Sequence, residues 1–229
     1  MCALLFTPHK ENTMIKAVIF DVDGTLLDTE RIYMQAWKDA AAEQGYVMPD
    51  SVLQKTRAVN TKDAARIFET EIGNGFSYTK TRPIRVRIAE EIIARESPIL
   101  KPGVLELLAY LEDKGIRLAV ASSTNTQTTK EHLAASGIAD RFEVIIGGDQ
   151  IVNGKPHPDI FLKAAEALGE APENCIVVED SPAGIRAGSA ARMHTVLVPD
   201  QAAITREIMD LSDAVLKTLL EMPAYMEKL

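Results

Sequence analysis

Short apolar segments that alternate with amphipathic segments are the feature that most constrains the fold of this chain. Five runs consist of consecutive β-branched and other apolar residues, at 17–20, 118–121, 144–146, 176–178 and 195–198. A strand that is apolar at every position, and not only at every second one, is buried on both of its faces. Because helical patterns separate these runs, the order strand–helix–strand predicts an α/β fold built on a parallel sheet with right-handed crossovers.

The helical patterns between the runs have recognisable ends. Proline favours the first turn of a helix, and glycine favours the position just after the last turn. Pro102 begins VLELLAYLEDK, which stops at Gly115, and Pro158 begins DIFLKAAEAL, which stops at Gly169. Similar signals delimit QTTKEHLAAS and AGIRAGSAAR. We therefore expect a helix in each of these connections.

One region departs from this alternation. Residues 29–97 contain no convincing strand but three helical patterns, IYMQAWKDAAAEQG, KDAARIFETEIG and TRPIRVRIAEEIIARE. We expect residues 14–28 and 98–229 to form the α/β core, residues 29–97 a helical cap inserted into it, and residues 1–13 a leader outside the fold. An insert after the first strand would lie over the carboxyl ends of the strands, where open sheets bind ligands. Linkers near 27–29 and 98–102 would let the cap open and close.

Composition and charge narrow the possible partners. A net charge of −8 and a pI near 5.1 disfavour binding to nucleic acid or to an anionic membrane. Residues 1–13 lack the basic and cleavage regions of a signal peptide and are too short to span a bilayer. Cys2 and Cys175 do not make a disulfide framework. We therefore expect a monomeric, cytoplasmic protein that acts on a small molecule.

Polar residues stand at the ends of four of the expected strands. Asp21 and Asp23 follow the first strand in VIFDVDGTLLDT. The segments SSTN (122–125), KP (155–156) and ED (179–180) come after the second, third and fourth. Each segment alone is compatible with a turn, a loop or the start of a capped helix. Since the ends of parallel strands meet at one rim of the sheet, all four together indicate a site.

This ordered set of motifs resembles that of the haloacid dehalogenase-like phosphatases and phosphomutases. The shared pattern is DxDGT after an apolar strand, a serine after the next core strand, then Lys-Pro and then Glu-Asp. The resemblance runs from Lys16 onward and is greatest to the subgroup with a helical cap after the first motif, which includes β-phosphoglucomutase. It implies a Rossmann-like parallel core with helices on both faces and an inserted helical-bundle cap.

The resemblance also implies that Asp21 is the nucleophile, since the family uses the first aspartate of DxD. Attack by a carboxylate on phosphorus gives an acyl phosphate and divides one difficult step into two. Because a carboxylate and a phosphate repel each other, we expect Mg²⁺ as cofactor, with metal-site residues Asp21, Asp23 (through its carbonyl), Glu179 (through a water) and Asp180. The side chain of Asp23 is then free to protonate the leaving oxygen and later to activate water.

The phosphoryl oxygens need hydrogen-bond donors and positive charge. Ser122 and the backbone amides after it are expected to hold them, and Lys155 to balance the charge that develops on them. Gly24 permits a tight turn, and Thr25 can lock that turn with a hydrogen bond. The expected catalytic residues are thus Asp21, Asp23, Ser122 and Lys155, and the expected phosphate-binding residues are Gly24, Thr25, Ser122, Ser123, Asn125 and Lys155.

Three positions bear on the choice between hydrolase and mutase. Compared with β-phosphoglucomutase, Tyr33 stands where that pattern has a histidine on the first cap helix, and Asn125 stands where it often has a lysine. The position of the cap arginine falls near Thr61, where this chain has no arginine, although Arg57 is close. We therefore expect Mg²⁺-dependent hydrolysis of a small phosphorylated metabolite, with a sugar phosphate as first choice. A β-phosphoglucomutase-like phosphohexomutase is the alternative. A non-catalytic phosphometabolite-binding protein is a third, which the presence of both a nucleophile and a general acid disfavours.

Side chains of the cap are expected to select the substrate. Trp37, on the first cap helix, is expected to pack in the core of the cap. The candidates for substrate contact, most of which we expect on solvated helix faces, are Arg57, Lys62, Arg82, Arg85 and Arg87.

Overall fold

The core of the protein is an open parallel sheet. The computed structural model describes residues 14–56, 61–97, 99–200 and 204–229, and within them the sheet has the strand order β3-β2-β1-β4-β5-β6 with every neighbouring pair parallel. The strands are β1 (Ala17–Phe20), β2 (Arg117–Ser122), β3 (Val144–Gly147), β4 (Cys175–Glu179), β5 (His194–Leu197) and β6 (Ala214–Val215). The expected α/β fold is confirmed. The edge strand β6 adds to the five expected strands, because two residues are too few to give a pattern.

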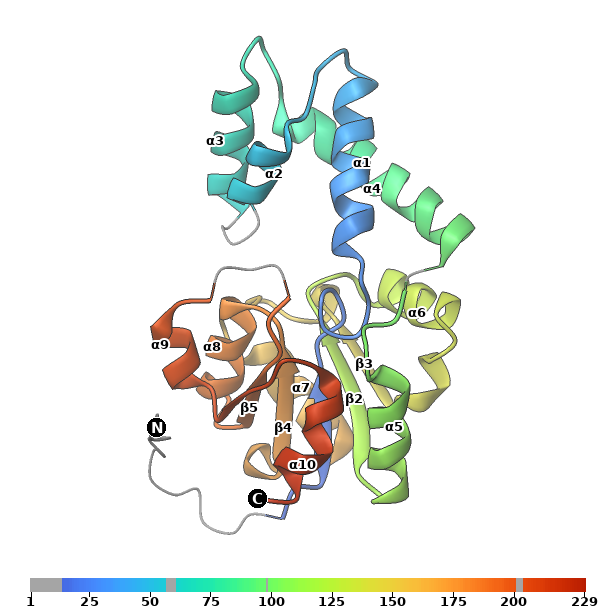
Figure 1. Ribbon diagram of the computed structural model, residues 1–229, viewed down its shortest axis with the longest axis vertical. Coiled ribbons are helices and arrows are strands. Elements are labelled where there is room, and N and C mark those ends of the chain that lie inside the picture. Colours follow the sequence, from blue (N-terminus) through green and yellow to red (C-terminus); the bar gives the residue numbers. More distant parts are fainter. Residues whose placement is uncertain (1–13, 57–60, 98, 201–203) are drawn as a thin grey trace.

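Helices cover both faces of the sheet (Figure 1). Val18 and Phe20 point to the face that packs against α5 and α10, and Ala17 and Ile19 point to the face that packs against α7 and α8. This is why the strands are apolar at every position. The core helices are α5 (Val104–Asp113), α6 (Thr126–Ala135), α7 (Asp159–Leu168), α8 (Pro182–Ala190), α9 (Arg206–Leu211) and α10 (Met222–Met226), with short 3₁₀ turns η1 (Ala139–Arg141), η2 (Gly148–Gln150), η3 (Pro172–Asn174) and η4 (Leu219–Glu221).

The ends of the core helices follow the proline and glycine signals closely. Helix α7 coincides with DIFLKAAEAL, and Gly169 ends it with a left-handed φ of 70°. Helix α5 begins two residues after Pro102, because Gly103 has a φ of 89° and lies outside the helix. A Cβ at Gly103 would lie 2.7 Å from the backbone nitrogen of Leu220, so the packing of η4 on this turn requires glycine.

Among the described residues between β1 and α5, the helices and strands of the structure are all helices. Its helices are α1 (Glu30–Ala42), α2 (Asp50–Thr56), α3 (Thr61–Ile72) and α4 (Tyr78–Glu96). The Trp37 ring lies 4.6 Å from the ring of Phe68 and 5.5 Å from that of Tyr78, within the apolar core of this bundle, as expected. Helix α2 adds to the three expected helices, because its seven residues show little periodicity.

Two segments join the helical bundle to the core and lie side by side. The N–H of Asp28 donates to the carbonyl of Ile99 (2.8 Å), and the N–H of Lys101 donates to the carbonyl of Leu26 (2.9 Å). Both segments leave the core near the carboxyl ends of the strands, so the bundle stands over that rim of the sheet (Figure 1). We refer to residues 99–101 as the return linker and to helices α1 to α4 as the cap.

Some of the expectations fall on residues that the structure does not describe. These are the leader at 1–13, position 98 of the second linker, Arg57, and the side chain of Lys62. Among the described residues, no helix combines the length and the apolar character needed to cross a membrane.

Candidate active site

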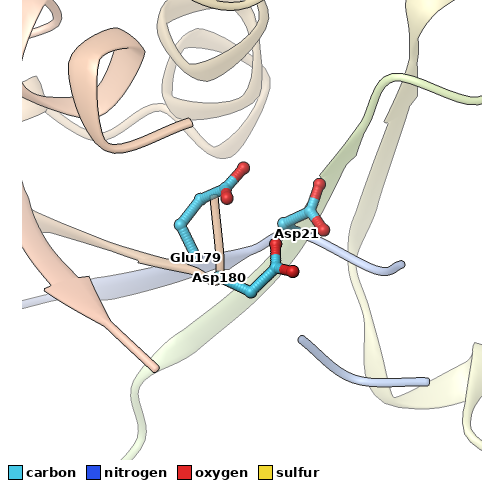
Figure 2. A group of neighbouring side chains, drawn as sticks. All are labelled: Asp21, Glu179 and Asp180. Carbon is cyan, nitrogen blue, oxygen red and sulfur yellow. The ribbon is translucent and has the colours of Figure 1, made fainter. Parts of the chain in front are cut away.

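Three carboxylates meet at the carboxyl ends of β1 and β4. Asp21 follows β1, Glu179 ends β4 and Asp180 comes next; the two strands are neighbours, and the N–H of Asp21 donates to the carbonyl of Val178 (3.0 Å). Each carboxylate offers an oxygen that lies within 4.8 Å of those of the other two (Figure 2). Asp21 is 7% exposed and Glu179 is 1% exposed. The sheet therefore concentrates negative charge in a place that water reaches poorly.

Lys155 supplies positive charge to this cluster. It lies in the loop after β3, and its Nζ donates to Asp21 Oδ1 (2.6 Å), Glu179 Oε1 (2.6 Å) and the carbonyl of Ala121 (3.1 Å). The ammonium also lies 4.9 Å from the centre of the Phe161 ring. One buried lysine thus joins the ends of β1, β2 and β4, and it occupies one oxygen of Asp21 while leaving the other.

The charges shift the pKa values of the cluster strongly. Burial raises the pKa of Asp21 to about 7 against the opposing effect of Lys155, and burial with the charges of Glu179 and Asp21 raises the pKa of Asp180 to about 9. Burial alone would lower the pKa of Lys155, but its two carboxylate partners outweigh that effect and raise it. One ammonium therefore does not balance the carboxylates. A hard divalent cation with oxygen ligands, such as Mg²⁺, fits this donor set.

Two glycines make room for these carboxylates. Gly24 has a φ of 89°, and a Cβ there would lie 2.9 Å from Cγ of Asp180. A Cβ on Gly184, in α8, would collide with the carboxylate of Glu179. Glu179 is also held by Ser181, whose N–H (2.9 Å) and hydroxyl (2.7 Å) both donate to Oε2. The sequence pattern indicates Gly24, but the roles of Gly184 and Ser181 appear only once α8 is placed.

Asp23 lies in different surroundings from Asp21. Its Oδ1 accepts hydrogen bonds from the hydroxyls of Thr29 (2.6 Å) and Tyr33 (2.8 Å), and its Oδ2 accepts one from Thr124 (3.1 Å). Burial, and then the charge of Asp23, raise the pKa of Tyr33, so this hydroxyl stays protonated. The guanidinium of Arg85 stacks 3.9 Å from the centre of the Tyr33 ring. The side chain of Asp23 is thus held by hydroxyl groups from both the cap and the core.

The expected phosphate-binding residues are not all equivalent. Ser123 lines the cavity described below, whereas buried Ser122 accepts a hydrogen bond from the N–H of Thr124 (3.1 Å). Asn125 caps α6, because its side-chain oxygen accepts from the N–H of Thr128. The hydroxyl of Thr25 is buried with no hydrogen-bond partner among the described residues.

The turn after Asp23 is held by the backbone instead of by the expected hydroxyl of Thr25. The N–H groups of Thr25, Leu26 and Leu27 all donate to the carbonyl of Val22, at 3.3, 3.0 and 3.0 Å. Three donors on one acceptor make a compact turn without any side chain. The expectation of a side-chain lock at Thr25 is therefore corrected.

A cavity of about 270 Å³ opens at this rim. Its volume suits part of a small metabolite. Two of the arginines considered as substrate contacts do not line this cavity: Arg87 pairs with Glu43 and Glu91 on the surface, and Arg82 is exposed. The cavity is lined by Asp21, Asp23, Gly24, Glu30, Ser123, Lys155, Glu179, Asp180, Ser181, Ala183 and Asp200.

Several residues at the site are absent from the sequence expectations. They are Thr29, Glu30 and Asp200. Asp200 follows β5 as the other polar residues follow their strands, so the same rule applied to the fifth run indicates it. Thr124 belongs to the segment SSTN and shares its signal, but Thr29 carries none, because only the folded chain brings it to Asp23.

Several known proteins are similar to this chain. Residues 15–192 match a family model described as haloacid dehalogenase-like hydrolase. The protein CbbY of Rhodobacter capsulatus is 35% identical over 225 residues, which cover 91% of this chain and 99% of that protein. A phosphorylated carbohydrates phosphatase of Thermotoga maritima is 34% identical over 186 residues, which cover 80% of this chain and 84% of that protein. A crystal structure of β-phosphoglucomutase from Clostridium difficile superposes with a TM-score of 0.75 and 26% identity, covering 94% of this chain and 96% of that one.

Proposed function

Since the chain belongs to the haloacid dehalogenase-like hydrolases and is a phosphatase, we propose that it hydrolyses a small phosphorylated metabolite with the help of Mg²⁺. The reaction would pass through an aspartyl phosphate on Asp21. The observation that carries this proposal is the contrast between two aspartates on one turn. Asp21 lies in a buried charged cluster with Lys155, whereas Asp23 is surrounded by hydroxyl groups.

The first step is attack by Asp21 on phosphorus. Lys155 occupies Oδ1 of Asp21, which leaves Oδ2 to form the new bond while the bond to the leaving oxygen breaks. Asp23 gives its proton to that oxygen. In the second step Asp23 takes a proton from a water molecule whose oxygen attacks phosphorus. The bond between phosphorus and Oδ2 of Asp21 breaks, which releases inorganic phosphate and regenerates the Asp21 carboxylate. Lys155 balances the charge on the phosphoryl group throughout.

The hydroxyls around Asp23 suit both protonation states. A hydroxyl can donate to a carboxylate or accept from a carboxylic acid, so Thr29 and Thr124 can remain partners of Asp23 when it carries a proton. When bound by Asp21, Asp180 and the carbonyl of Asp23, Mg²⁺ would supply the positive charge that lets a carboxylate approach a phosphate. Glu179, fixed by Ser181 and Lys155, would orient a water of that cation.

Replacing Asp21 by Asn tests the nucleophile. An amide is a very poor nucleophile, so D21N should lower Mg²⁺-dependent phosphate release from an aryl phosphate by at least about 10³-fold. Asp140→Asn, on an exposed 3₁₀ turn, is the matched control and should keep full activity. Full activity of D21N would exclude Asp21 as nucleophile.

We take a sugar phosphate as the substrate class. The similarity to a phosphatase of phosphorylated carbohydrates and the small cavity beneath a cap support this choice. A panel of sugar, polyol and acid monophosphates, assayed with and without Mg²⁺, tests it. The highest kcat/KM should fall on a sugar or polyol phosphate, and a clear preference for a phosphorylated carboxylic acid would contradict the choice.

A phosphohexomutase is the second candidate. The structural similarity to a β-phosphoglucomutase favours it, but Tyr33 stands where that enzyme's pattern has histidine, and here it binds Asp23. Incubation with β-glucose 1-phosphate and a hexose bisphosphate primer decides between the two reactions. Free phosphate should form faster than glucose 6-phosphate, and the reverse would favour the mutase.

A further inference from the structure

An ion pair at the edge of the cavity plays no part in the proposed reaction. Nζ of Lys101 lies 2.6 Å from Oδ1 of Asp200, and the two side chains are 21% and 11% exposed. Lys101 belongs to the return linker of the cap, whereas Asp200 comes shortly after β5. Asp200 also lines the cavity together with Asp180. The pair is thus partly buried and adjacent to the candidate cation site.

The second carboxylate oxygen of Asp200, Oδ2, is close to the carboxylate of Asp180. A Cβ placed on Gly24 would lie 2.9 Å from Cγ of Asp180 and 3.5 Å from Oδ2 of Asp200. Both carboxylates therefore approach the same point of the turn that follows Asp23. The carboxylate of Asp200 therefore lies on the side of the site where Asp180 offers its oxygens.

Lys101 is fixed to that same turn. Its N–H donates to the carbonyl of Leu26 (2.9 Å), and a β-bridge joins the neighbouring residues Leu27 and Leu100. The N–H of Gly24 donates to the carbonyl of Leu27 (2.9 Å). The ammonium of Lys101 is thus anchored close to the site by its own backbone. It offsets the charge of Asp200 at the place where the cap linker rejoins the core.

We infer that Asp200 and Lys101 are a pair of positioning residues that sets the affinity of the site for its cation. Asp200 adds attraction for a divalent ion without being a ligand, and Lys101 limits that attraction. The inference rests on the proposed function, since it presumes a cation at Asp21 and Asp180. A pair that only stabilised the fold would not change cation binding in two opposite directions.

The two single substitutions should change the affinity for Mg²⁺ in opposite directions. Asp200→Asn removes a negative charge and should weaken Mg²⁺ binding about fivefold. Lys101→Met keeps the aliphatic stem but leaves Asp200 unpaired, so Mg²⁺ binding should tighten about threefold. The double variant should bind nearly as the wild type does. Because the pair is partly exposed, added salt should reduce each difference.

The measurement is isothermal titration of MgCl₂ into the metal-free, full-length protein without substrate. The control variants are Arg186→Met and Glu207→Gln, which break an exposed ion pair of 2.8 Å between α8 and α9 and should leave the affinity unchanged. Unfolding midpoints in the absence of Mg²⁺ show whether each variant is folded. If Asp200→Asn does not fold, the inference is still tested by whether Lys101→Met binds Mg²⁺ more tightly than the wild type does.

Two kinds of failure are distinguishable. If the wild type binds Mg²⁺, Asp180→Asn abolishes that binding, and Lys101→Met binds Mg²⁺ equally or more weakly, the inference is wrong while the proposed function stands. Unchanged binding in a folded Asp200→Asn would overturn it in the same way. If the wild type binds no Mg²⁺, the proposed cation site fails, and the inference fails with it.

Discussion

At the scale of single residues, Asp21 and Asp23 differ mainly in the donors that hold them. Asp21 accepts a hydrogen bond from the ammonium of Lys155, which can donate but not accept. A proton on this oxygen of Asp21 would therefore break that hydrogen bond. Asp23 accepts from three hydroxyls, each able to reverse its role. Lys155 thus favours an anionic, nucleophilic Asp21 against the burial that raises its pKa, and the hydroxyls suit a proton-exchanging Asp23.

Tyr33→Phe tests the surroundings of Asp23. The variant keeps the ring under Arg85 but loses the hydroxyl that lies 2.8 Å from Oδ1 of Asp23. Loss of one hydrogen bond to a charged group corresponds to about 1.5–3 kcal/mol, so kcat for a generic phosphate ester should fall about tenfold or more. Steady-state kinetics measure it, and Tyr46→Phe, whose hydroxyl donates to the carbonyl of Asn74 away from the site, is the control. Equal kcat in both variants would show that Tyr33 does not support Asp23.

At the scale of elements, the start of α8 fixes one carboxylate of the cluster. Ser181 caps the helix by accepting from the N–H of Gly184 (3.1 Å), and its own hydroxyl donates to Glu179. The first turn of α8 therefore lies directly against Glu179, and no side chain fits between them at Gly184. The helix positions the carboxylate through its cap and through this contact.

Gly184→Ala tests that contact. Alanine is the better helix former by about 1 kcal/mol, so helix propensity alone predicts a more stable protein. The added Cβ would instead collide with Glu179, which Lys155 and Ser181 hold in place, and we expect a net loss of about 1–3 kcal/mol in the free energy of unfolding. Gly154→Ala is the control, because nothing lies within 4 Å of its Cβ position. Urea unfolding of both variants would reveal the difference, and a stabilised Gly184→Ala would refute the contact.

The sequence predicts those elements whose patterns are long enough to be read. Five strands have continuous apolar runs, whereas β6 has two residues and α2 has seven, too few to separate a pattern from chance. The meeting of Asp21, Glu179 and Asp180 at one rim could be predicted, because the strands before them are parallel and their carboxyl ends lie at the same edge of the sheet. The partners of Asp23 could be predicted only in part: Thr124 belongs to the polar segment after β2, whereas no sequence pattern marks Thr29 in the linker.

At the scale of the whole molecule, the site combines the ends of five strands with one linker of the cap. β1 and β4 bring carboxylates, the loops after β2 and β3 bring hydroxyls and Lys155, and the segment after β5 brings Asp200. The carboxylates exceed the ammonium groups that pair with them. The folded protein therefore holds a charge imbalance that a divalent cation would relieve, and this imbalance couples stability to pH.

The last prediction concerns this coupling. Asp21 and Asp180 have folded-state pKa values of about 7 and about 9, against an ordinary value of 3.8. At these two positions the folded chain binds more protons than the unfolded chain above about pH 4, so both groups make stability fall as the pH rises towards 9. The raised pKa of Lys155 changes stability only above its ordinary value of 10.5. Without divalent cations, the unfolding midpoint should thus fall by several degrees between about pH 5 and pH 9.

Mg²⁺ should remove much of that fall, because a bound cation favours the ionised carboxylates. Thermal unfolding followed by circular dichroism, with EDTA or with excess Mg²⁺ at each pH, measures both effects. Asp180→Asn is the matched variant: it lacks the group with the larger shift, so its midpoint should depend less on pH and respond little to Mg²⁺. Parallel pH curves with and without Mg²⁺ in the wild type would show that these carboxylates do not share a cation, because only a cation bound to them makes its stabilising effect grow as they ionise.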